Sequence, residues 1–291
     1  MSVEIKKVDT ERDRLGEGPL WDPQDQVLYW VDSNGCRIRR LDPASGDVQN
    51  WPVSEQIGSM ALRESGGAVI ALKSGFHFFD FESGTATPII DPEQDEGRTR
   101  FNDGKVDRQG RFLAGSMDMP GTNAFRGSLY RLDPDLKLTR LRENVGVSNG
   151  PCFSPDGNTF YFADSPRKMI WAYDYDGATG DLSNMRTFID LEPLGAIPDG
   201  ATVDADGCLW SALVSRGRIG CFSPDGELVR TIEVPTDHPS SVMFGDPGLD
   251  VLYVTSIWEW LHVKTENDAD GHLFAIHGLD TAGLPERRFT G

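Results

Sequence analysis

The sequence is poor in positive charge. Its 28 Lys and Arg residues stand against 46 Asp and Glu residues, which gives a formal net charge of −18. A surface of this sign repels the phosphates of nucleic acids and the head groups of anionic lipids. We therefore expect neither a nucleic acid nor a membrane as a partner.

The four cysteines show no metal-binding or redox spacing. No CxxC pair occurs, and Cys36, Cys152, Cys208 and Cys221 lie in apolar, strand-like stretches. We interpret them as buried thiols in a reducing compartment, although Cys208 and Cys221 could lie on neighbouring strands and form a disulfide. The first residues contain no apolar signal region, and no stretch approaches the ~20 apolar residues of a membrane span. These features predict a cytoplasmic protein.

The sequence also lacks a clear helical period, and a β-type unit recurs instead. The unit is a polar residue, a short strand, a turn with Asp or Gly, and further strands with aliphatic or aromatic residues. Six copies follow one another at intervals of about 41–50 residues, the length of a four-stranded propeller blade. The sequence therefore predicts an all-β fold, a six-bladed β-propeller of four-stranded antiparallel blades around a central channel.

The beginning of the chain fits this repeat. Residues 3–8 form a strand-like stretch with no partner in the first unit, and an unpaired strand edge is a liability. We expect this strand to complete the sixth blade. No linker or change of composition divides residues 1–291, so we expect a single β-propeller domain. Residues 92–99, 118–126 and 258–270 interrupt the repeats and are predicted to be loops.

The polar residues that open the six units define a ring around the predicted channel, because the first strand of each blade lines the channel. They are Glu17, Ser59, Asn102, Asn149, Asp199 and Ser240. In four units the polar residue stands five positions before an Asp or Ser. Burying two carboxylates together costs several kcal/mol unless something compensates, and a divalent cation does. A solvated channel of small polar residues is the plainer interpretation, which Ser59 and Ser240 fit.

The donor atoms of the ring narrow the choice of metal. Carboxylate and amide oxygens are hard ligands that suit Ca²⁺, Mg²⁺ or Mn²⁺. No Cys or His falls on the ring, although His238 stands two residues before Ser240. A classical zinc site is thus disfavoured. We predict one divalent cation, Ca²⁺ in the first place, with Zn²⁺, Mn²⁺, Mg²⁺ or Fe²⁺ as alternatives.

The motifs around the ring resemble those of the regucalcin/gluconolactonase family, the sugar lactonases. The resemblance covers nearly the whole chain, in order and at matching intervals. It rests on LGEGPLW at 15–21, RFNDGKVD at 100–107, SNGP at 148–151, FSPDG at 153–157 and PDG at 198–200. It implies a six-bladed propeller with one divalent cation in the channel.

The resemblance also assigns roles to single residues. By motif, Glu17, Asn149 and Asp199 are the metal ligands, and Arg100 and Asn102 match substrate-contacting positions. Some family members carry a substrate-binding Glu after a Gly-Thr-Met phrase, where this chain has Met119.

Asp118, next to Met119, is the acidic candidate for substrate binding at this point. Its side chain would face away from that of Met119 if the segment is a strand.

These assignments imply hydrolysis of a sugar (aldono-) lactone to the aldonic acid. The sequence has no GxSxG elbow, and no Ser–His–Asp set falls on the ring, so we expect no covalent serine catalysis. A metal would act as a Lewis acid, and Asp199 would act as general base toward water. Arg100 would bind the substrate or, alternatively, neutralise the acidic ring.

Two other functions fit the same architecture. One is a metal-dependent, phosphotriesterase-like hydrolase, and the other is a non-catalytic calcium-binding propeller. The carboxylates and amides at the channel favour an enzyme. We expect a small-molecule sugar lactone as the partner and a monomer or weak homo-oligomer as the state of the protein.

Overall fold

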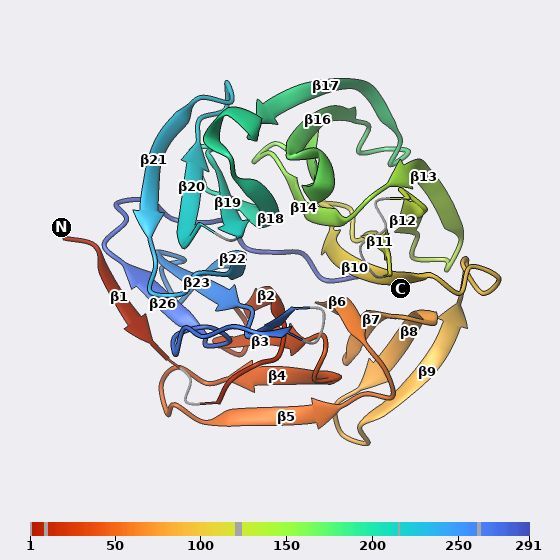
Figure 1. Cartoon of the computed structure of the whole chain (residues 1–291). Helices are drawn as coiled ribbons and strands as arrows, with labels where there is room; N and C mark the ends of the chain where they lie inside the picture. Colours follow the sequence, from red (N-terminus) through yellow and green to blue (C-terminus); the bar gives the residue numbers. More distant parts are fainter. Residues whose placement is uncertain (1, 9–10, 120–123, 215, 261–262) are drawn as a thin grey trace.

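The computed structural model describes residues 2–8, 11–119, 124–214, 216–260 and 263–291. Six four-stranded antiparallel sheets surround a central axis, which confirms the predicted six-bladed propeller (Figure 1). Each sheet is one blade. The first strand of every blade lies innermost, and the later strands step outward.

The blades follow the chain, and their strands have the following bounds. Blade one is β2 (Gly16–Asp22), β3 (Val27–Asp32), β4 (Arg37–Leu41) and β5 (Val48–Pro52). Blade two is β6 (Ile57–Leu62), β7 (Ala68–Leu72), β8 (Gly75–Asp80) and β9 (Thr85–Ile90). Blade three is β10 (Thr99–Val106), β11 (Phe112–Asp118), β12 (Gly127–Leu132) and β13 (Leu138–Val145).

The second half continues in the same way. Blade four is β14 (Ser148–Phe153), β15 (Thr159–Asp164), β16 (Met169–Tyr175) and β17 (Leu182–Asp190). Blade five is β18 (Ile197–Val203), β19 (Leu209–Val214), β20 (Arg218–Phe222) and β21 (Leu228–Glu233). Two short 3-10 helices, η1 (Ser165–Arg167) and η2 (Glu192–Leu194), lie in links of blades four and five. No helix of the described residues has the length and apolar character needed to cross a membrane.

The sixth blade joins the two ends of the chain. Its strands are β22 (Pro239–Gly245), β23 (Val251–Ser256), β26 (Phe274–His277) and, at the outer edge, β1 (Glu4–Lys7). β1 pairs antiparallel with β26, with Glu4 opposite His277. The expectation that the N-terminal strand completes this blade is therefore confirmed. The pairing covers the edge that β26 would otherwise expose.

Apolar side chains fill the space between the blades. One large buried cluster lies between each pair of neighbouring blades. The strands alternate such residues on both faces because each blade packs against two neighbours. A fully buried large apolar side chain contributes roughly 1.5–3 kcal/mol, so these clusters hold the six inner strands in fixed positions.

All four cysteines are free thiols, and Cys152, Cys208 and Cys221 take part in this packing. Cys152 and Cys221 are buried, as expected, whereas Cys36 and Cys208 are only half-buried. Cys208 and Cys221 are not joined by a disulfide.

Each inner strand breaks its pairing register near its ring residue. The breaks fall between Glu17 and Leu20 in β2 and between Asn149 and Cys152 in β14, with equivalents in the other four inner strands. Gly18 and Gly150 occupy these bulges with a φ of 52°, a conformation that favours glycine. A Cβ at Gly150 would also come within 2.9 Å of the Asp199 carbonyl oxygen. Bulges of this kind re-aim a side chain, here toward the axis.

The residue five positions after the ring residue stabilises the turn at the opposite end of the inner strand. Oδ1 of Asp107 accepts hydrogen bonds from the amides of Gln109 and Arg111, and Oδ1 of Asp204 accepts from those of Asp206 and Cys208. These bonds close the turns that lead into the second strands. The recurring phrase therefore combines a channel residue and a turn residue.

Residues 282–291 cross the face of the propeller where these turns lie, and we call them the C-terminal strap. Backbone hydrogen bonds join the strap to Ala205 of blade five, Leu249 of blade six, Leu62 of blade two and Gly110 of blade three. Figure 1 shows it running across the middle of the ring of blades. The inner strands begin near their ring residues and end at this face, so the ring lies toward the opposite mouth.

The described parts of the three predicted loops lie at the mouth near the ring, beside the starts of the inner strands. Thr99, which ends the first loop, pairs with Asp118, which begins the second. The third is not wholly irregular, because β24 (Glu259–Trp260) and β25 (Val263–Lys264) form a small hairpin in it. Residues 120–123 and 261–262 of these loops lie outside the described residues.

The strap predicts a measurable contribution to stability. Phe289 is 0% exposed and packs into the cluster between blades two and three. We expect Phe289→Ala to destabilise the protein by about 3–5 kcal/mol, because it leaves a cavity in a closed core. Urea unfolding followed by tryptophan fluorescence measures this, with Val229→Ala, at a position 58% exposed, as the control. Equal midpoints for the two variants would contradict the packing role of the strap.

Candidate functional site

The six ring residues occupy the inner strands, one in each blade. All are buried, with exposures from 0% for Ser240 to 7% for Asn102. Two of them are carboxylates, Glu17 on β2 and Asp199 on β18, and two are amides on β10 and β14. The structure therefore brings the predicted site residues of blades one, three, four and five to one channel.

A chain of hydrogen bonds links the site residues of three blades. Nη1 of Arg100 donates to Oδ1 of Asn102 at 2.8 Å, and Nδ2 of Asn102 donates to Oδ1 of Asn149 at 2.7 Å. Nδ2 of Asn149 donates to Oγ of Ser165 at 2.8 Å, and that hydroxyl donates to the Pro198 carbonyl at 2.6 Å. The chain fixes both amides and ends beside Asp199.

Burial and mutual repulsion disfavour the charged forms of the two ring carboxylates. Burial raises the pKa of Glu17 well above its ordinary value, and Asp199 and Asp103 raise it further. Burial also raises the pKa of Asp199, again with a contribution from Asp103. Burial lowers the pKa of Arg100 to about 10, against the opposing effect of Glu17 and Asp199. One buried guanidinium thus faces several carboxylates, and a further positive charge would be stabilised among them.

The donor atoms available for that charge are oxygens. Within the described residues, no three His, Cys, Asp or Glu side chains gather closely enough to hold a metal ion by themselves. An amide oxygen would therefore have to complete a set with Glu17 and Asp199. Oδ1 of Asn149 accepts one hydrogen bond and keeps a second lone pair. Two carboxylates and one amide match the preferences of a hard divalent cation, so the residues fit the predicted group.

Asp118 lies at the edge of this site. It ends β11 opposite Thr99 and is only 3% exposed. Its Oδ1 accepts a hydrogen bond from Nη1 of Arg126 at 3.1 Å. The predicted substrate-binding carboxylate is thus buried and ion-paired at the ring-side mouth, and Arg126 is the more exposed partner.

The two serines of the ring have structural surroundings. Oγ of Ser240 hydrogen-bonds to the Gly16 carbonyl and to the Thr255 hydroxyl. Ser59 packs against Gly104, where an added Cβ would come within 2.7 Å of its Oγ. His238 lies close by in the chain, and its Nδ1 is 3.0 Å from Oδ2 of Asp270. The Ser240 hydroxyl is thus hydrogen-bonded, whereas the buried Ser59 hydroxyl has no hydrogen-bond partner among the described residues.

Two buried residues of the site escaped the sequence analysis. Ser165, in η1, joins Asn149 to the neighbouring blade, and no repeat or motif pointed to it. Asp103 accepts hydrogen bonds from the amides of Gly104 and Gly150. A signal existed for Asp103, because the position after the ring residue is glycine in three other units and a carboxylate in this one.

Comparison with known proteins places the chain among relatives along its full length. The family model described as the SMP-30/Gluconolactonase/LRE-like region matches residues 15–258. Regucalcin from Xenopus laevis is 37% identical, covering 100% of this chain and 99% of that protein. The 6-deoxy-6-sulfogluconolactonase from Pseudomonas putida is 38% identical, covering 100% of both chains.

A solved structure agrees with this relationship. The calcium-binding protein regucalcin from Agrobacterium tumefaciens has a TM-score of 0.91 and 27% identity, and the match covers 98% of this chain and 97% of that one. The family model matches well over half of the chain, and the Xenopus and Pseudomonas relatives exceed 30% identity over its whole length. The chain therefore belongs to the SMP-30/gluconolactonase/LRE-like family, the one that its motifs resemble.

Proposed function

We propose that this protein hydrolyses a sugar lactone to the corresponding aldonic acid and needs a divalent cation to do so. The main support is the gathering of Glu17, Asn149 and Asp199 with Arg100 and Asn102 at one channel. Two buried carboxylates beside an amide oxygen suit a cation, and the neighbouring guanidinium and amide suit a polyhydroxylated substrate.

Glu17, Asn149 and Asp199 are the proposed ligands of the cation. When bound, the cation would supply Lewis acidity to the carbonyl of the lactone and stabilise the developing oxyanion. Ca²⁺ is our first choice, because oxygen donors predominate and because the Agrobacterium regucalcin is named a calcium-binding protein.

Asp199 is the proposed general base. Its carboxylate takes a proton from water as the water oxygen bonds to the lactone carbonyl carbon. The bond between that carbon and the ring oxygen then breaks, and the ring oxygen leaves as a hydroxyl by taking up the proton that Asp199 received, which returns Asp199 to the carboxylate. The sum is addition of one water to the lactone. Burial of Asp199 keeps bulk water from competing for the carboxylate.

Arg100 and Asn102 are the proposed substrate contacts. Arg100 is buried and donates to Asn102, so the two present a fixed pair of polar groups rather than a mobile side chain. We keep Asp118 as a third contact, acting together with its partner Arg126 at the mouth.

The relatives suggest which lactones to test. The Pseudomonas relative is named for a gluconolactone that carries a sulfonate at carbon 6. Arg126 is a candidate for binding such a group, since it lies at the ring-side mouth and its side chain is 33% exposed. A neutral and an anionic lactone are therefore both candidates.

The first prediction concerns turnover and substrate. We expect acid release above the spontaneous rate from at least one of glucono-, galactono-, arabino-, xylono- and 6-sulfogluconolactone in a pH-stat. Chelation should abolish the enzymatic rate, and Ca²⁺, Mg²⁺, Mn²⁺, Fe²⁺ or Zn²⁺ should restore it in a ranked order. No turnover of any lactone, together with hydrolysis of a phosphotriester, would replace the lactonase proposal.

The second prediction concerns the base. We expect Asp199→Asn to lower kcat by roughly 10²–10⁴-fold, the usual contribution of a general base, because an amide takes no proton. Ser59→Ala is the matched control, since Ser59 belongs to the same ring but has no proposed role. A kcat of Asp199→Asn close to the wild type would remove Asp199 from that role.

The third prediction concerns metal removal and pH. A carboxyl group with a raised folded pKa stabilises the fold below its unfolded pKa, and this contribution is lost as pH rises through the folded pKa. For Glu17 the loss begins near its ordinary value of 4.5. We therefore expect Glu17→Gln to raise the unfolding temperature of the metal-free protein at pH 8, by roughly 2–4 °C for each kcal/mol recovered.

The same variant should lose the stabilisation that a cation gives the wild type, about 2.7 kcal/mol at a concentration one hundred times Kd. Calorimetric scans at pH 5 and pH 8, with and without Ca²⁺, measure both effects. A gain that is equally large at pH 5 and pH 8 would argue against the electrostatic origin.

A further inference from the structure

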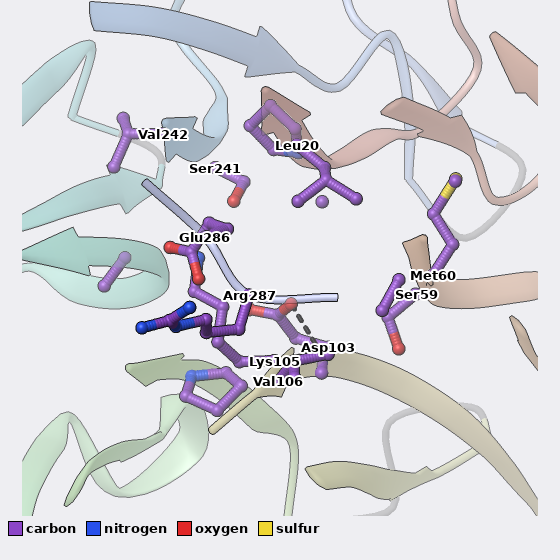
Figure 2. Close-up of a pocket in the computed structure, with 16 residues that line it drawn as sticks. Leu20, Ser59, Met60, Asp103, Lys105, Val106, Ser241, Val242, Glu286 and Arg287 are labelled. Atoms are coloured by element: carbon purple, nitrogen blue, oxygen red, sulfur yellow. Dashed lines mark hydrogen bonds and ion pairs between the residues drawn. The ribbon is translucent and has the colours of Figure 1, made fainter. Parts of the chain in front are cut away.

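A small, partly open cavity lies between the ring and the C-terminal strap. Its volume is about 20 Å³, enough for roughly one water molecule. Asp103, Lys105, Ser59 and Ser241 line it from the inner strands, and Glu286 lines it from the strap (Figure 2). The cavity thus joins the floor of the proposed site to the last residues of the chain.

Asp103 connects this cavity with the ring in two ways. Its Oδ2 accepts the backbone amide of Gly150 at 2.9 Å, and its Oδ1 accepts that of Gly104 at 2.8 Å. Gly150 follows Asn149 directly and forms the bulge that turns Asn149 to the axis. The Asp103 carboxylate also acts electrostatically on Glu17 and Asp199.

Lys105 and Glu286 form an ion pair next to Asp103 in this cavity. Nζ of Lys105 lies 3.0 Å from Oε1 of Glu286, and both side chains are largely buried. Burial raises the pKa of Asp103 to about 6, and Lys105 opposes this rise. Glu286 in turn favours the charged form of Lys105 against the cost of its burial.

We infer that Asp103 is a positioning residue of the site, and that the strap acts on the site through Glu286, Lys105 and Asp103. Asp103 holds the backbone that aims Asn149 and adds negative charge beneath the two ring carboxylates. Glu286 contributes negative charge to the cavity, against the positive charges of Lys105 and of Arg287, which also lines the cavity from the strap. The inference rests on the proposed function, because it assigns the strap a part in the cation affinity of the ring.

The test compares cation affinities by calorimetric titration of Ca²⁺ and Mn²⁺ into metal-free protein. We expect Asp103→Asn to weaken binding roughly 10–100-fold, as is typical when a group that supports a metal ligand is removed. Glu286→Gln should weaken it by roughly 2–10-fold, since its charge is further from the ring. The double variant Lys105→Met with Glu286→Gln removes both charges of the pair and should return close to the wild type.

A matched control comes from the strap itself. Arg288 also pairs with an inner-strand residue, Asp22, at 2.7 Å, but it lies outside the cavity. Arg288→Gln should loosen the strap as much as Glu286→Gln does, measured by thermal unfolding, without changing cation affinity. If Glu286→Gln and Arg288→Gln leave the affinity equally unchanged, the strap is a structural closure only and the inference is overturned.

A measurement without metal separates this inference from the proposed function. Hydrogen exchange at the Gly150 amide reports the bond to Asp103 directly. We expect its protection to fall in Asp103→Asn and to persist in Ser59→Ala. Unchanged protection would overturn the positioning role even in a protein that binds the cation, whereas absence of any cation binding by the wild type would count against the proposed function instead.

Discussion

The central constraint on this molecule is the burial of several oxygen donors where six inner strands approach one axis. Glu17 and Asp199 would repel each other at neutral pH, and burial deprives them of water. Arg100 supplies a compensating positive charge, and hydrogen bonds that run from blade three to blade five hold the two amides in place. We propose that a bound cation supplies the rest of the positive charge.

The propeller supplies the rigidity that such a site needs. Apolar clusters between neighbouring blades fix the inner strands, and the pairing of β1 with β26 closes the circle. Because the ring residues stand on strands rather than on loops, their relative positions depend on core packing. The strap adds to this frame, since its backbone is hydrogen-bonded to blades two, three, five and six at the opposite face.

The family relationship covers the entire fold but does not by itself identify the substrate. Relatives of almost equal identity carry different names, regucalcin in Xenopus and a sulfogluconolactonase in Pseudomonas. One architecture therefore occurs in proteins with different names, so the fold alone does not define the substrate. In this chain Arg126 and Asp118 form an ion pair at the ring-side mouth, where β11 ends opposite the start of β10.

The sequence alone determined the architecture and most of the candidate ring. A unit of about 41–50 residues recurs six times in the sequence. The number of blades, the closing strand and the ring positions followed from this repeat, because each copy shows the same alternation and turn residues. The repeat identified Asn149 and Asp199 as ring residues, because the short motif around each of them recurs in other units. It gave no information about Ser165, which lies outside this motif.

Only the tertiary structure decided how the strap, Asp103 and Lys105 meet. Glu286 and Lys105 are separated by most of the chain, and their pairing depends on where the last residues cross the propeller. The hydrogen bond from Gly150 to Asp103 likewise joins two blades and has no local signature. Contacts of this kind depend on how the closed ring of blades packs, whereas the strands themselves follow from short-range alternation and turn chemistry.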